Sequence, residues 1–192
     1  SRKHEDIDIF LLREEQWIVF RSLSRDWQLY KAEDGKLTPW EEGEFLASTK
    51  DIWVSKGEGS PWSFQLMLVD TDRRHWIYGR ERSISAPLSE IIDRTEGGIP
   101  YLKPEIQLLY KGGGSAIREK DHQDFAAVLP MLSPRAREWL GASLRKQFPG
   151  GHAWIAYVEK PTPQPPSQNT HARTHSSRRN DVGNNGLEYP TD

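Results

Sequence analysis

The sequence predicts an α+β fold: a small twisted mixed sheet in the N-terminal half, a helical part after it, and a disordered tail. Up to about residue 78, short runs alternate apolar with polar side chains, which is the period of β-strands. From Pro104 onward, apolar residues recur at spacings of three and four, which is the period of helices. We therefore expect a sheet region over residues 1–100, a helical region over residues 101–158 and a tail over residues 159–192.

The sheet region is expected to contain one helix, over residues 14–23, packed on strands over residues 7–12, 27–32, 51–54, 63–70 and 75–78. Asp34 and Gly35 follow the second of these strands, and an Asp-Gly pair is typical of a β-hairpin turn. Residues 37–43, with Pro39 and Trp40, are expected to form a short turn or loop. The last two strands are expected to pair across a turn at residues 70–74.

Two or three helices are expected in the helical region. The clearest one begins at Ser133, because serine is a good N-cap and Pro134 suits the first turn. It is expected to end near residues 148–151, whose sequence is Phe-Pro-Gly-Gly. After Lys160 the chain is rich in proline, serine, threonine and asparagine and has few large apolar side chains. Such a segment buries too little surface to offset the entropy of ordering it.

The composition limits the class of protein. The chain has 192 residues, 35% of them hydrophobic and 28% charged, with a formal net charge of −2. This balance is ordinary for a globular protein and argues against a strongly basic nucleic-acid surface. There is no cysteine, which excludes disulfides, thiolate zinc sites and a cysteine nucleophile. No apolar run approaches 18 residues and no signal-peptide pattern is present, so we expect a cytoplasmic protein without a membrane partner.

The most informative feature is a pair of aspartates, Asp6 and Asp8, interleaved with Ile7 and Ile9. In a strand, alternate side chains share a face, so the two carboxylates lie about 6.6 Å apart while the isoleucines point into a core. Two carboxylates at this separation suit Mg²⁺, which prefers a few carboxylates together with water and substrate phosphates. The alternative is an edge strand with an acidic outer face.

Two segments resemble a known family. Residues 1–9, SRKHEDIDI, resemble the T-R-x-H-x-D-I-D signature of aminoglycoside nucleotidyltransferases, members of the DNA polymerase β-type nucleotidyltransferase superfamily. Residues 98–111, GIPYLKPEIQLLYK, and residues 120–125, KDHQDF, resemble the P-E-x-x-L-L-x-K and K-D-x-x-D-F helix pair of adenylyltransferase-like proteins. The order of these motifs also agrees, and the resemblance covers residues 1 to about 157.

The resemblance implies a nucleotidyltransferase-type sheet, with Mg²⁺ held by Asp6 and Asp8 and with ATP or another NTP as co-substrate. The implied reaction transfers a nucleoside monophosphate to a hydroxyl of a small acceptor, an aminoglycoside-like antibiotic. In the family a third carboxylate lies on the strand antiparallel to the D-x-D strand, which here is expected over residues 64–70. Asp70 is the first candidate and Asp72 the second. Gln65 is the alternative at that position, an amide that can ligate a metal but cannot act as a base.

Four basic or imidazole side chains are candidates for binding the triphosphate: Arg2, His4, Lys111 and Lys120. Arg2 and His4 flank the aspartate strand, whereas the two lysines come from separate expected helices and can converge on phosphates. For all four, a solvated surface position is the alternative interpretation. Members of the superfamily also carry a Gly-Gly or Gly-Ser turn before the D-x-D strand, and the chain starts after that point. We therefore expect an N-terminally truncated enzyme, with low activity.

The acceptor site has two candidate features. Trp40, Trp53 or Trp62 can provide an aromatic wall, which suits sugars and fused rings. An acidic cluster can attract a polycation, and five carboxylates are candidates for it: Glu33, Asp34, Glu41, Glu42 and Glu44. The glycine run at residues 112–114 is expected to be a flexible turn between helices.

Two alternatives to an active enzyme stay open. The chain can be a catalytically silent nucleotide-binding or partner-binding module, similar to an antitoxin. It can also be an inactive fragment. The oligomeric state is not defined by the sequence.

Overall fold

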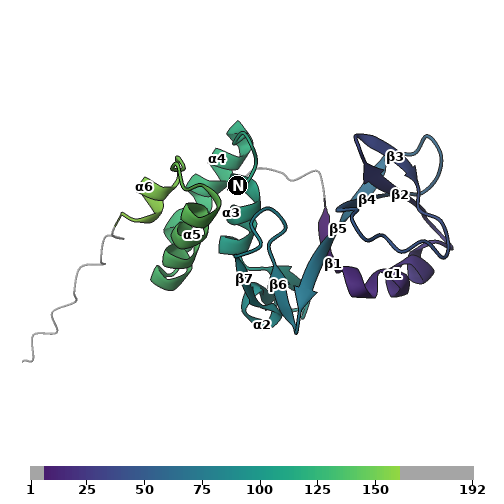
Figure 1. The fold of residues 1–192 in the computed structure, drawn as a ribbon, viewed down its shortest axis with the longest axis horizontal. Coiled ribbons are helices and arrows are strands. Elements are labelled where there is room, and N and C mark those ends of the chain that lie inside the picture. The colour runs from purple at the N-terminus through teal and green to yellow at the C-terminus, as the bar shows by residue number, and fades with distance from the viewer. Residues whose placement is uncertain (1–6, 161–192) are drawn as a thin grey trace, which may run out of the picture. The chain divides into compact units, whose positions relative to one another are not determined.

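In the computed structural model, which describes residues 7–160, the chain has a mixed α+β fold built on a seven-stranded sheet (Figure 1). This confirms the mixed class expected from the change of period. The described residues belong to one compact unit, Ser1–Thr162. Arg2, His4, Asp6 and most of the expected tail over residues 159–192 lie outside the described residues.

The sheet is built mainly from hairpins. Its strands are β1 (Asp8–Leu12), β2 (Gln28–Glu33), β3 (Lys36–Pro39), β4 (Asp51–Ser55), β5 (Trp62–Asp72), β6 (His75–Ile77) and β7 (Ser85–Pro87). Their spatial order is β3-β2-β4-β5-β6-β7, with β1 also paired to β5. Every pair in this sheet is antiparallel except β1–β5, which is parallel. The expectation that β5 runs antiparallel to the aspartate strand is therefore wrong.

Local turn chemistry explains two of the hairpins. Asp34 and Gly35 have φ angles of 51° and 72°, the left-handed pair that a tight hairpin between β2 and β3 requires. The return strand β3 overlaps the segment that was expected to be a loop. The sequence does not predict this strand, because its four residues are all exposed and give no alternating apolar pattern. Arg73 and Arg74, at φ 48° and 67°, form the corresponding turn between β5 and β6, as expected for that hairpin.

One face of the sheet carries the first hydrophobic core. The helix α1 (Gln16–Leu23) follows a 3₁₀ turn, η1 (Arg13–Glu15), and contributes Phe20 to it. The core is completed by eight other buried residues: Leu11, Leu29, Trp40, Leu46, Ile52, Val54, Leu66 and Leu68. The members of this core on β4 and β5 are spaced by two residues, so the residues between them point to the opposite face of the sheet.

The helical region begins after a short connection that the sequence did not predict. It comprises α2 (Leu88–Ile91), β8 (Ile92–Arg94) and β9 (Pro100–Leu102), of which β8 and β9 pair with each other. Then come α3 (Pro104–Gly112), α4 (Glu119–Val128), η2 (Leu129–Met131), α5 (Pro134–Gln147) and α6 (Ile155–Val158). The Ser133 side chain accepts a hydrogen bond from the Ala136 N–H, which confirms the predicted N-cap.

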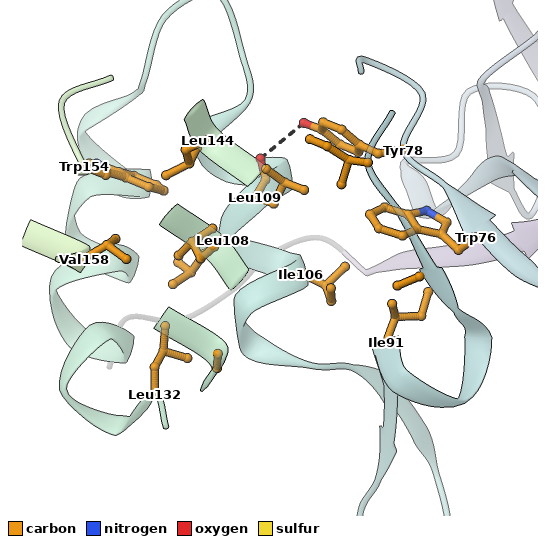
Figure 2. Close-up of a cluster of buried hydrophobic side chains, with 14 of the residues drawn as sticks. Trp76, Tyr78, Ile91, Ile106, Leu108, Leu109, Leu132, Leu144, Trp154 and Val158 are labelled. Atoms are coloured by element: carbon orange, nitrogen blue, oxygen red, sulfur yellow. Dashed lines mark hydrogen bonds between the residues drawn. The ribbon is translucent and has the colours of Figure 1, made fainter. Parts of the chain in front are cut away.

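The second hydrophobic core joins these helices to the far end of β5 and to β6 (Figure 2). Trp76 and Tyr78 are completely buried against Ile106 and Leu109 of α3. The Tyr78 hydroxyl donates a 3.3 Å hydrogen bond to the Leu109 carbonyl oxygen (Figure 2). This core therefore contains residues from both sides of the boundary expected at residue 100. Within residues 7–160, no helix combines the length and the apolar character needed to cross a membrane.

Candidate active site on the open face of the sheet

Strand β1 carries Asp8 at the edge of the described sheet. Asp8 is exposed, and so are Ile7 and Ile9, at 62% and 41%. The expectation that both isoleucines point into a core is wrong, because α1 covers this face of the strand only from Leu11 onward. Ile9 instead lines a shallow apolar depression of about 280 Å³ together with Val19 and Leu23 of α1. Asp6 lies outside the described residues, so only Asp8 of the expected pair can be placed.

A row of side chains extends from Asp8 across three strands. The register pairs Asp8 with Gln65, Gln65 with Trp53, and Trp53 with Tyr30. Residues paired in register share a face, so these four side chains lie on the face opposite to the first hydrophobic core, which α1 covers and which we call the α1 core. Apart from exposed Asp8, each of them is half-buried. We call this set the polar–aromatic row.

Gln65 is oriented by a carboxylate that sequence reasoning missed. Its Nε2 donates a 2.7 Å hydrogen bond to Oδ1 of Asp51. Asp51 is two residues before Trp53 on β4 and therefore lies on the same face as Gln65 and Asp8. The amide oxygen of Gln65 takes no part in this hydrogen bond. The alternation in residues 51–54 was the available signal, since it places Asp51 and Trp53 on one face.

The aromatic end of the row is a cluster of three rings. The exposed Trp62 lies edge-on to Tyr30, with ring centroids 5.5 Å apart, and tilted against Trp53 at 5.8 Å. We call Tyr30, Trp53 and Trp62 the aromatic platform. Trp40, the third tryptophan considered for a wall, is buried in the α1 core, where its indole N–H donates to the Glu44 carbonyl oxygen.

Asp70 and Asp72 are not brought to Asp8. Asp70 lies five residues beyond Gln65 on β5, which is about 16 Å along the strand, and an odd separation places it on the opposite face. Its carboxylate accepts hydrogen bonds from Arg13, at 2.6 Å, and Arg82, at 3.0 Å. The hydrogen bond from Arg13 is the main cause that lowers the pKa of Asp70, against an opposing effect of burial. Asp72 is exposed at the end of β5, two residues beyond Asp70 and therefore on the same face as Asp70. The structure thus brings neither candidate for the third carboxylate to Asp8.

The two halves of the second sequence motif meet in an ion-pair network between α3 and α4. Lys111 Nζ lies 2.8 Å from a carboxylate oxygen of Asp124 and 3.7 Å from one of Asp121. Arg118 donates two hydrogen bonds to Asp121, at 2.6 and 3.1 Å. Asp121 is only 1% exposed, and burial by itself would raise its pKa, but the hydrogen bonds and charge of Arg118 give a net lowering.

Arg118 connects this network to the sheet. Its pKa is raised first by the hydrogen bond to Asp121 and then by the charges of nearby carboxylates, among them Asp8. The sequence predicts Lys120 as the phosphate-binding residue of this helix. Lys120 is exposed and adjacent to Asp121, so it projects about 100° round α4 from the side that holds Lys111. The structure therefore brings Lys111 and Arg118 together, and not Lys111 and Lys120.

Three side chains with oxygen donors lie on the sheet face that carries Asp8. Asp8 and Asp51 supply carboxylates and Gln65 an amide oxygen, which are donors that Mg²⁺ accepts. Within the described part of the chain, no three His, Cys, Asp or Glu side chains are grouped closely enough to form a complete metal site. In comparisons with family models, curated proteins and solved structures, no match to this chain was found.

Proposed function

We propose that this protein is a metal-dependent nucleotidyltransferase that moves a nucleoside monophosphate from ATP, or another NTP, to a hydroxyl of a small, aminoglycoside-like acceptor. The observation that carries the proposal is the position of Asp8. Its exposed carboxylate lies at one end of the polar–aromatic row, and its charge is one of those that raise the pKa of Arg118. A carboxylate that shares a sheet face with an aromatic surface and interacts with the charge of a basic group suits a metal–triphosphate complex and an acceptor at one place.

The described donors fit Mg²⁺. Asp8 is the carboxylate that would hold the ion, together with Asp6 from the resembling motif, and Gln65 offers an amide oxygen on the same face. When bound, Mg²⁺ would supply positive charge that offsets the negative charge developing during phosphoryl transfer. The chain's own basic groups would then bind the remaining charge: Arg118, with its raised pKa, and Lys111.

Asp51 takes the role that the sequence analysis gave to Asp70. It lies on the face of Asp8 and fixes the Gln65 amide by a hydrogen bond. A carboxylate in this position can orient the acceptor hydroxyl and accept its proton, a contribution of about 10²–10⁴-fold in rate. Asp70 is instead occupied by two arginines on the other face.

The test is nucleotide binding followed by product release. Titration calorimetry with Mg²⁺-ATP, and then a pyrophosphate assay in the presence of kanamycin, are carried out on wild type, Asp8→Asn and Asp72→Asn. We expect Asp8→Asn to lower both signals by about 100-fold or more, because it removes a metal-binding charge. Asp72→Asn removes an exposed carboxylate at the end of β5, the strand that pairs with β1, and is expected to change neither. Equal activity of wild type and Asp8→Asn would refute the proposal.

One observation favours a second candidate, a catalytically silent nucleotide-binding module. The residue level with Asp8 on β5 is Gln65, whose amide cannot accept a proton. The same pair of assays separates the two functions. A silent module binds Mg²⁺-ATP in an Asp8-dependent way and releases no pyrophosphate with any acceptor.

A further inference from the structure

We propose that the aromatic platform is the acceptor subsite, and that it binds a hydroxylated ring compound by stacking on the carbon–hydrogen face of the ring. The inference rests on the proposed function, because it names how the acceptor of that same site is recognised. It replaces the acidic cleft that the sequence suggested for a polycationic acceptor.

The first argument is the position of the platform relative to Asp8. Strand β1 lies between α3 and α4 on one side and β4 and β2 on the other (Figure 1). The basic residues Lys111 and Arg118 are on the helical side, whereas Trp53 and Tyr30 continue the row on the strand side. In phosphoryl transfer the attacking and leaving oxygens lie roughly in line across the phosphorus. Pyrophosphate leaving toward the basic side therefore places the acceptor on the aromatic side.

The second argument is the chemistry of the platform and its border. Tyr30, Trp53 and Trp62 meet at centroid distances of 5.5 and 5.8 Å, and Trp62 is 45% exposed. Gln65 and Asp51 border the rings on the same face, joined by their 2.7 Å hydrogen bond. An apolar ring surface with a few polar groups at one edge is the usual lining of a small-molecule site, and it matches a sugar-type ring with apolar faces and peripheral hydroxyls.

The third argument is that the acidic cluster lies on the other face. Lys31 is paired in register with the buried Ile52, so it is on the α1 side of the sheet. Its ammonium contacts Glu44 and lies 4.0 Å from Glu33, and the hydrogen bond to Glu44, followed by the charges of Glu44, Glu33 and Glu41, raises its pKa. Glu44 and Glu33 are thus paired with a cation of the chain on the face opposite to the platform.

The experiment uses kanamycin and its fully N-acetylated derivative as probes, because the two share rings and hydroxyls but differ in positive charge. Binding to the full chain is measured by calorimetry without nucleotide, in low and high salt. We expect both probes to bind with affinities within about tenfold of each other and with little salt dependence, since stacking is not screened by ions. Trp62→Ala is expected to weaken binding about tenfold or more, and Trp62→Phe about threefold or less.

A charge variant is the matched control. Asp34→Asn, Glu41→Gln and Glu42→Gln, combined, are expected to change probe affinity less than about twofold, because these exposed residues are not among the side chains that form or border the platform. Loss of binding in this variant with full binding in Trp62→Ala would overturn the proposal. The proposal would also be overturned if neither probe binds to the wild-type chain at about 10 mM. Failure of the proposed function is seen separately, as Mg²⁺-ATP that neither binds nor releases pyrophosphate while the probes still bind.

Discussion

Replacing Asp70 by asparagine tests whether this residue stabilises the fold or takes part in the chemistry. In the structure its carboxylate accepts charged hydrogen bonds from Arg13, at 2.6 Å, and from Arg82, at 3.0 Å. The Arg13 side chain is 15% exposed and also donates to the Leu46 and Thr49 carbonyl oxygens at 2.8 Å each. Arg82 is largely exposed, so its pair with Asp70 is screened by solvent.

The expected cost follows from these exposures. A partly buried charged hydrogen bond contributes about 1.5–3 kcal/mol, and an exposed pair about 0–1 kcal/mol. Because Arg13 keeps two carbonyl partners, and Asp70 itself is about one-third exposed, we expect Asp70→Asn to lower the free energy of unfolding by about 2 kcal/mol at pH 7. This corresponds to a fall in Tm of about 4–8 °C for a domain of this size, measured by thermal unfolding.

The pH dependence of that difference has a definite sign. The pKa of Asp70 is lower in the folded protein than in the unfolded chain, mainly because of the Arg13 hydrogen bond. Its stabilisation is therefore complete above the unfolded value of about 3.9 and is lost as the pH falls through the lower folded value. The gap between wild type and Asp70→Asn should close in that acidic range. An unchanged Tm at pH 7, or loss of pyrophosphate release equal to that of Asp8→Asn in a folded variant, would refute this interpretation of Asp70.

Three further changes test other parts of the structure. Asp51→Asn should lower pyrophosphate release about 10²–10⁴-fold with little change in Tm, as measured by steady-state kinetics and thermal unfolding; unchanged kinetics would exclude it as the third carboxylate. Arg118→Gln should raise the KM for ATP about tenfold, because it removes a positive charge that interacts with Asp8, whereas Lys120→Gln should leave that KM unchanged. Gly113→Ala should destabilise the fold by about 1–3 kcal/mol, because the added Cβ would lie 2.0 Å from the Tyr78 hydroxyl oxygen. Gly114→Ala is the control, because its Cβ would have no neighbour within 3.0 Å. Equal denaturation midpoints for the two variants would contradict this argument.

The parts of the fold that could be predicted from the sequence depend on local chemistry. The Asp34-Gly35 turn, the Ser133 cap and the strands around Leu29 and Leu66 follow from residues that are near neighbours in the chain. Strand β3 and the short elements between residues 85 and 102 carry no regular apolar pattern, so period alone could not find them. The glycine run was expected to be flexible, yet a Cβ at Gly112 would lie 2.7 Å from Trp154. The need for glycine at this position comes from a residue that is distant in the chain, so no local sequence pattern indicates it.

The candidate site could be predicted only in part, for the same reason. Asp8 and Lys111 stood out because they lie in recognisable motifs. The choice of Asp70 depended on which face of β5 it occupies relative to Asp8, and that is set by a parallel pairing across more than fifty residues. Since a shift of one residue in a strand reverses the face, residue type could not separate Asp70 from Gln65. The alternation in residues 51–54 places Asp51 and Trp53 on one face of β4, but only the register of β4 on β5 shows that Gln65 shares that face.

The convergence of the two motifs has a simple physical basis in the packing of one aromatic pair. Phe10 and Asp8 are two residues apart on β1 and therefore share a face. Phe10 packs edge-on against Tyr110 of α3, with ring centroids 5.0 Å apart, and Tyr110 immediately precedes Lys111. Burial of Phe10 thus holds the start of β1 near the end of α3, and the ion pairs of Lys111 with Asp121 and Asp124 hold α4 beside α3. Arg118, at the beginning of α4, is in this way fixed where its charge interacts with Asp8, so apolar packing determines which basic group the aspartate strand meets.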